Sequence, residues 1–416
     1  MNFIAVCLHC LDMRDFHSHM RDTPFLDRLR ERSIFVPTGR AQGHNQADSL
    51  NAELTGIWTA RFCDSELTEN GFREAETYWL PETVLEAMGD AGLDVITRLA
   101  QWTVLGTAAV DPGMRNVWLR DEPERLAQFA SPREMNLDEW IAALRGSDRF
   151  YAHVFLRHTH RPWRDVEGLY GLVGETPPED WDWPNDASCA RRAALQQPDA
   201  FAALRRRALA EADRMLEKIF DATRDLPDVT YVVYSNHGEV FDHFRYQLPH
   251  PDPGDGMIRG TSHGPFPYEV LYANMQMWLI PGHSPRVMRG IGRSIDIAPT
   301  IFELAGLDRP GLDGESMLQH FDDGAFPDRD RYAENPGGCV SMVRSDGWKL
   351  ISTGRRKAEP PQHAPDHHRL AVFDLRSDPY EYVNLAHTPQ GHEVLRWAVE
   401  RHRELQASRV PAPSAA

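Results

Sequence analysis

The sequence predicts an α/β fold with a large mixed, mostly parallel sheet flanked by helices, and a small C-terminal α+β subdomain. Short apolar, β-branched runs alternate with amphipathic helical segments over most of the chain, and hairpin-like strands follow residue 330. We expect a main domain over 1–330 and a C-terminal subdomain over 331–416. A chain of 416 residues is long enough to bury a deep pocket.

The predicted strands of the main domain end in polar residues. Phe3–Leu8 is followed by His9 and Cys10, and Thr230–Tyr234 is followed by the segment Ser235–Glu239. Open α/β sheets bind ligands at the carboxyl ends of their strands, so we expect these polar groups to share one edge. Further strands are predicted at about Asp94–Thr97, Phe150–Leu156 and Met275–Ile280.

Helix signals lie between these strands. Thr23–Arg32 combines a threonine cap with a proline at the first helical position, and Pro81–Ala91 ends at a glycine. An apolar stripe with helical spacing predicts a long helix over Ala200–Thr223. The remaining predicted elements are a helix over Asp296–Gly306, a hairpin near Val340–Ile351, a strand at Leu370–Leu375 and a closing helix at Glu393–Gln406.

Composition excludes some classes of partner and location. A net charge of -17 makes nucleic acid an unsuitable partner, because its binders cluster Lys and Arg. No apolar run approaches the roughly 18 residues of a membrane span. MNFIAVCL lacks the features of a signal peptide, and five cysteines without framework spacing fit a reducing compartment, so a cytoplasmic location is expected. A homo-oligomer remains open.

Seven segments in order resemble motifs of the sulfatase branch of the alkaline phosphatase superfamily, which also holds phosphonate monoester hydrolases and phosphoethanolamine transferases. Each motif alone is weak, but their shared order over nearly the whole chain is a strong signal. The segments are Thr23–Leu29, Leu54–Gly56, Arg157–Trp163, Ser235–Glu239, His263–Glu269, Asp296–Gly306 and Phe373–Leu385. The resemblance implies an alkaline phosphatase-like fold and a small anionic substrate.

The chain departs from the family at the positions that carry its chemistry. The resemblance implies a metal held by an acidic pair after the first strand and by an Asp-His pair, yet this sequence has His9-Cys10 and Asn236-His237 there. The formylglycine segment corresponds to Gln46–Leu50, which lacks Cys, Pro and Arg at the motif positions. We therefore expect no formylglycine. In the transferase-like register, Asn45 stands where a threonine would attack.

The resemblance then assigns roles to individual residues. His160, His263 and Asn45 are the expected catalytic residues, and His44, Cys10 and Glu239 are expected to bind the substrate. The expected metal ligands are His9, Asn236 and His237. Imidazoles with an amide suit Zn²⁺ better than Ca²⁺ or Mg²⁺, so one divalent metal, zinc in preference, is the expected cofactor.

Alternatives to these roles remain open. Nineteen histidines place several near any cleft by chance, and Cys10 after an apolar strand is also consistent with an inert core thiol, a metal ligand or a nucleophile. Glu239 is also consistent with a solvated or supporting group. Three functions follow: a divergent hydrolase or transferase acting on a sulfate, phosphate or phosphonate ester, a binding protein that has lost the chemistry, and a member adapted to non-ester chemistry.

Overall fold

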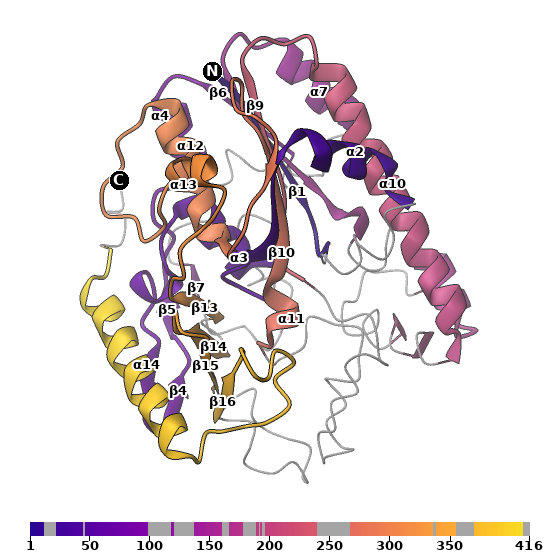
Figure 1. The fold of residues 1–416 in the computed structure, drawn as a ribbon. Coiled ribbons are helices and arrows are strands. Elements are labelled where there is room, and N and C mark those ends of the chain that lie inside the picture. Colours follow the sequence, from indigo (N-terminus) through magenta and orange to yellow (C-terminus); the bar gives the residue numbers. More distant parts are fainter. Residues whose placement is uncertain are drawn as a thin grey trace.

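The structure of the protein is a computed structural model. The structure describes residues 1–11, 22–44, 46–98, 118–119, 137–159, 166–177, 189–190, 192–193, 196–238, 267–335, 338–354 and 370–410. Within this part of the chain, an eight-stranded sheet forms the centre of the molecule, as Figure 1 shows. Its strands are β1 (Asn2–Leu8), β2 (Ile34–Arg40), β6 (Asp94–Arg98), β8 (Phe150–Leu156), β9 (Val229–Ser235), β10 (Ala273–Leu279), β11 (Arg286–Val287) and β12 (Gly292–Arg293).

The strand directions confirm a mixed, mostly parallel sheet. The order is β11-β2-β10-β9-β1-β8-β6, with β12 also paired to β2. Strands β6, β8, β1 and β9 are parallel to one another, whereas β10 is antiparallel to both β9 and β2. The amino end of β10 therefore lies at the same edge as the carboxyl ends of β1, β2, β8 and β9.

Helices cover both faces of the sheet because its strands are apolar on both sides. In β1, Ile4, Val6 and Leu8 pack in one core, whereas Phe3, Ala5 and Cys7 pack in the other. Figure 1 shows α2, α7 and α10 on one side and α3, α4, α12 and α13 on the other. These helices are α2 (Pro24–Arg32), α3 (Gln46–Thr55), α4 (Val84–Asp90), α7 (Leu137–Arg145), α10 (Pro198–Thr223), α12 (Ile297–Ala305) and α13 (Leu318–Asp323).

Helix ends agree with the sequence signals except at α2. Thr83 and Glu86 form a capping box at the start of α4, and Gly306 ends α12 in a left-handed conformation. Thr23 occupies the N-cap position of α2 as expected, but its side chain makes no cap bond. Instead, the Asp213 carboxylate of α10 accepts from two backbone N–H groups of α2 at 2.9 and 2.8 Å. A distant carboxylate thus performs the capping function.

The C-terminal part forms its own antiparallel sheet. Strands β13 (Arg331–Asn335), β14 (Cys339–Val343), β15 (Trp348–Thr353) and β16 (Leu370–Asp374) pair in chain order. Helix α14 (Pro389–Ala407) shares a core with them, and Trp58 and Phe72 join the same core from the main part of the chain. Shorter elements are β3 (Glu66–Thr68), β4 (Gly71–Arg73), β5 (Thr77–Tyr78), β7 (Trp118–Leu119), α8 (Val166–Gly171) and α11 (Glu269–Tyr272). None of the helices in the described ranges is both long and apolar enough to cross a bilayer.

Candidate active site

Three parallel strands carry their carboxyl ends to one edge of the sheet. The register pairs Leu8 of β1 with Leu156 of β8 on one side and with Ser235 of β9 on the other. The residues that follow these strands are therefore neighbours. This edge is where an open α/β sheet offers a ligand site.

His9, Cys10 and His237 form a buried cluster at this edge. One potential ligand atom from each residue, two imidazole nitrogens and one sulfur, lies within 4.8 Å of the other two. The two imidazole rings meet edge to face, with centroids 5.4 Å apart. Nitrogen and sulfur donors of this kind suit zinc rather than calcium or magnesium. Within the described ranges, this is the one group of three such side chains close enough to share an ion.

The backbone fixes the orientation of His237. Its Nδ1 lies 2.8 Å from the carbonyl oxygen of Gly238, which can only accept, so Nδ1 carries the proton and donates. In the neutral ring, Nε2 then holds the lone pair, and the Cys10 Sγ lies 3.6 Å from it. A tetrahedral zinc with Zn–S and Zn–N bonds of about 2.3 and 2.1 Å separates S from N by about 3.6 Å. A histidine that donates its second N–H to a carbonyl is typical of metal ligands.

Cys10 lies in a strained turn that Asn236 supports. The φ angle of Cys10 is 61°, in the left-handed region that non-glycine residues seldom adopt. The Cys10 backbone N–H donates to Asn236 Oδ1 at 3.1 Å. The oxygen that would bind a metal in the role expected for Asn236 thus also holds the Cys10 turn. Asn236 Nδ2 is buried and has no hydrogen-bond partner within the described part of the chain.

Two residues that the sequence did not single out contact His9. The Thr159 hydroxyl donates to the backbone carbonyl oxygen of His9, and the Phe155 ring lies with its centroid 4.8 Å from that of His9. Strand β8 pairs directly with β1, so a contact between the end of β8 and His9 follows from the topology. The segment RHTHRPW has a pattern of histidines, and nothing in that pattern marks Thr159.

His44 lies at the same edge of the sheet but has other neighbours. It follows β2, which is three strand positions from β1, and this corresponds to about 14 Å at the usual spacing. The His44 ring is buried, stands perpendicular to Tyr272 at 6.4 Å and places its Nδ1 4.0 Å from Cys339 Sγ. His44 thereby connects this edge to the C-terminal sheet. The other candidates, Asn45, His160, Glu239 and His263, lie outside the described residues.

A second polar group lies in the core beneath the cluster. His153 Nε2 is 3.1 Å from the Tyr234 hydroxyl, and burial lowers the pKa of His153 to about 4. Burial also raises the pKa of Cys7 and of Glu53 well above their ordinary values. Cys7 is therefore an inert core thiol, only three residues before Cys10.

A known family model matches most of this chain. Residues 5–307 match the family model described as Sulfatase, which is well over half of the chain. The chain belongs to the sulfatase family. This sulfatase-family chain is also 26% identical over 221 residues to the multifunctional alkaline phosphatase superfamily protein PehA of Trinickia caryophylli. The alignment covers 45% of this chain and spans only 37% of the length of PehA.

Solved structures share the fold over nearly the whole length. The structure of BT4656 in complex with its substrate D-glucosamine-2-N,6-O-disulfate superposes with a TM-score of 0.63 at 14% identity, covering 99% of both chains. The phosphonate monoester hydrolase of Agrobacterium radiobacter gives a TM-score of 0.60 at 16% identity, covering 98% of this chain and 96% of that one. The predicted alkaline phosphatase-like fold is confirmed.

Proposed function

We propose that this sulfatase-family chain is a divergent, metal-dependent hydrolase or transferase that acts on a small anionic sulfate, phosphate or phosphonate ester without formylglycine. The proposal depends on one observation: His9, Cys10 and His237 converge within 4.8 Å at the edge of the sheet. The substrate class is supported by the family and by two solved structures that share the fold. One is BT4656 with its substrate D-glucosamine-2-N,6-O-disulfate, and the other is a phosphonate monoester hydrolase.

In this proposal the cluster residues hold a metal ion, and the residues next to them keep the ligands in place. His9, Cys10 and His237 would hold one divalent ion, zinc in preference. When bound, such an ion polarises an ester oxygen and offsets negative charge on the transferring group. Gly238 holds the proton on Nδ1 of His237. Asn236 holds the Cys10 turn and is retained as a candidate further ligand.

The chemistry without formylglycine relies on groups around this cluster. Gln46, where the resemblance places the formylglycine precursor, is the first residue of α3 and offers no aldehyde or hydroxyl. We assign acid or base work to His160 and His263, orientation of a water or oxyanion to Asn45, and substrate contacts to His44 and Glu239. Cys10, which was expected to bind the substrate, is here a metal ligand. An amide donor or an imidazole can stabilise charge or move a proton, but an amide is a poor nucleophile.

Metal content of purified variants tests the cluster. We expect about one zinc per wild-type chain by elemental analysis, and at least a tenfold loss in His237→Ala and in Cys10→Ala, because each loses a ligand. Cys7→Ala is the matched control, since it removes a buried thiol from the preceding strand and should keep the metal. Equal metal content in Cys7→Ala and Cys10→Ala, or no metal in the wild type, would contradict the proposal.

Turnover decides between catalysis and binding alone. The wild type is expected to hydrolyse at least one member of a panel of sulfate, phosphate and phosphonate esters, and His237→Ala should lose that activity. The alternative, a binding protein without catalysis, is favoured by the structural use of Asn236 Oδ1. It predicts a ligand-dependent rise in Tm without product over the same panel.

A further inference from the structure

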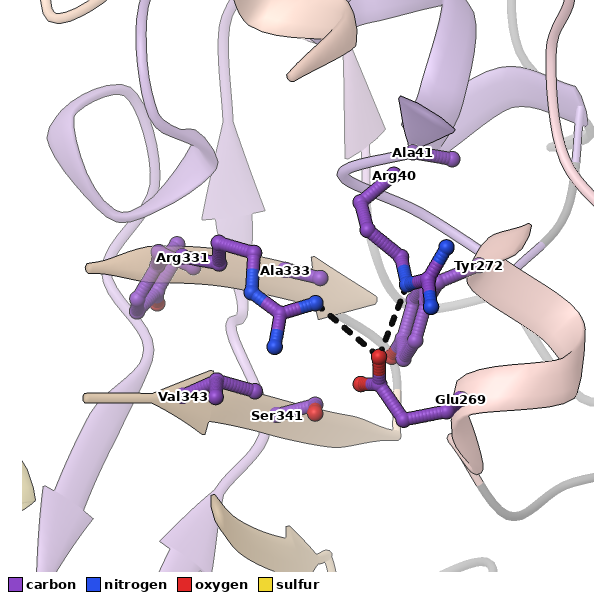
Figure 2. A pocket seen from close by; sticks show the side chains of 9 residues that line it. Arg40, Ala41, Glu269, Tyr272, Arg331, Ala333, Ser341 and Val343 are labelled. Carbon is purple, nitrogen blue, oxygen red and sulfur yellow. Dashed lines mark hydrogen bonds and ion pairs between the residues drawn. The ribbon is translucent and has the colours of Figure 1, made fainter. Parts of the chain in front are cut away.

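A small recess lies between the main sheet and the C-terminal sheet, apart from the His9 cluster. Arg40 at the end of β2, Glu269 and Tyr272 of α11, and Arg331 of β13 line it, together with Ser341 of β14 (Figure 2). Its free space is about that of one water molecule. A monoatomic ion fits such a space, whereas a sulfate or a carboxylate group is too large.

The charges around the recess form one connected network. Arg40 Nε and Arg331 Nη1 both donate to Glu269 Oε2, at 2.8 and 2.9 Å, and Figure 2 shows the two guanidinium groups reaching this carboxylate from two sides. Lys349 Nζ lies 3.1 Å from Glu269 Oε1 and 2.7 Å from Glu381 Oε1. Three cations and two carboxylates therefore share one site.

This network carries a net positive charge in a place with little water. The side chains of Arg40, Arg331 and Lys349 are 22%, 11% and 0% exposed, and those of Glu269 and Glu381 are 11% and 3% exposed. Among the described residues, three cations face two carboxyl groups, and burial raises the pKa of one of these, Glu381, to about 7. At least one positive charge is therefore unbalanced. A buried charge without a partner is costly, so such a site favours a counter-ion.

The pKa values of Arg331 and Glu269 agree with an excess of positive charge around the recess. Burial lowers the pKa of Arg331, and the nearby Arg40 lowers it further against the opposing effect of Glu269. Burial raises the pKa of Glu269, but Arg331, Lys349 and Arg40 outweigh it and hold this pKa well below its ordinary value. Glu269 is thus fully ionised and has no further charge to offer.

Toward the described part of the chain, both guanidinium groups retain donors for an additional partner. Each carries five N–H groups in a rigid plane. The Arg40 Nη1 also donates to the carbonyl oxygen of Gly39 at 2.9 Å, so its hydrogen bonds use two nitrogens and leave Nη2. Arg331 is bonded to Glu269 through Nη1. The guanidinium group is weakly hydrated, which favours contact with a weakly hydrated anion.

We propose that this recess binds one monoatomic anion, chloride in ordinary buffers, as the counter-ion of Arg40 and Arg331. The bound anion joins β2, α11 and β13 and so stabilises the contact between the main and C-terminal sheets. This site is independent of the His9, Cys10 and His237 cluster, and its test does not involve activity.

Bromide replaces chloride as the probe. In crystals grown with sodium bromide, we expect an anomalous peak in the recess, beside the two guanidinium groups. In solution, replacing sodium gluconate by sodium bromide at constant ionic strength should give a saturating rise in Tm, about 2 °C at ten times Kd. Sodium sulfate at matched ionic strength should give no saturating rise that depends on Arg331, because sulfate is too large for the recess.

Two variants separate the site from general salt effects. Arg331→Met should lose the saturating response to bromide, whereas Arg145→Met, which breaks an exposed ion pair with Asp225, should keep it. If Arg331→Met does not fold, the anomalous data on the wild type decide alone. The absence of an anomalous peak in the recess, or an equal bromide response in wild type and Arg331→Met, would overturn the proposal.

Discussion

Glu334 shows how burial changes the pKa of one carboxyl group. It lies in β13, where the Tyr332 hydroxyl and the Cys63 thiol both donate to its carboxylate. Burial is the main cause that raises its pKa to about 7, against an ordinary value of 4.5. The folded chain therefore keeps a proton on Glu334 over a range of pH in which the unfolded chain has released it.

This shift predicts a pH-dependent difference between the wild type and Glu334→Gln. The folded pKa lies above the unfolded one, so the contribution of Glu334 to stability falls as pH rises from about 4.5 to about 7. Between pH 4.5 and pH 8, the unfolding free energy of the wild type should fall by up to about 3 kcal/mol relative to that of the variant. Urea unfolding of both proteins at four pH values measures this difference.

The neighbouring His402 changes stability with pH in the opposite direction, but it does so equally in the wild type and in Glu334→Gln. Burial lowers the pKa of His402 to about 4, so its contribution to stability is lost as pH falls below about 6.5. Both proteins contain His402, and the difference between them isolates residue 334. Curves of unfolding free energy against pH that run parallel would show that Glu334 is not protonated in the folded state.

At the scale of elements, the start of α2 depends on a side chain from another helix. Asp213 of α10 accepts from the backbone N–H groups of Phe25 and Leu26, which otherwise lack partners within the first turn. The carboxylate also lies at the positive end of the α2 dipole. One residue therefore both caps α2 and fixes α2 against α10.

Asp213→Ala should lower the unfolding free energy by about 1–2 kcal/mol, because two buried donors lose their acceptor. Glu217→Ala on the same helix is the matched control. Its ion pair with Arg28 is exposed on both sides, and its loss should cost less than about 1 kcal/mol. Thermal or urea unfolding measures both. Equal losses in the two variants would contradict the capping role.

The elements that the sequence predicted are those with strong local patterns. The predicted Phe150–Leu156 strand has the observed bounds, and the long helix differs from the prediction by two residues at its start. Strand β2 was not predicted, because its sequence IFVPTGR contains a proline and a glycine. In the structure, the register of β2 against β10 shifts between Val36 and Gly39, the stretch that contains the proline.

In the candidate site too, the features that local sequence patterns predict differ from those that depend on tertiary contacts. Local patterns placed His9 and His237 after strands, and parallel pairing then brings them to one edge. The hydrogen bond of Asn236 to the Cys10 N–H and the contact of Thr159 with His9 depend on strand register and on side-chain rotamers. No pattern in the sequence encodes these contacts, so only the folded chain reveals them.

At the scale of the whole molecule, Lys349 joins the two sheets. It lies in β15, is completely buried, and contacts Glu269 of α11 and Glu381. Its Nζ also donates to the carbonyl oxygen of Pro267 at 2.8 Å. Because its partners come from separate parts of the chain, this ammonium group connects the main sheet to the C-terminal one.

Lys349→Met should lower the unfolding free energy by about 3–5 kcal/mol, since it leaves two buried carboxylates without this cation. Arg344→Met is the matched control in the neighbouring turn. Its two carboxylate partners, Asp346 and Glu393, are both exposed, so its loss should cost less than about 1 kcal/mol. Urea unfolding followed by tryptophan fluorescence checks both values. A loss below about 1 kcal/mol in Lys349→Met would show that Lys349 does not hold the sheets together.

The outer side of β2 has a consequence for how the protein behaves at high concentration. Two strands of two residues each cover this side: β11 pairs with Ile34 and Phe35, and β12 pairs with Gly39 and Arg40. A long exposed strand would offer another molecule a row of hydrogen-bonding groups. Here the row along β2 is divided and already occupied, so this side of the sheet resists growing by strand addition between molecules.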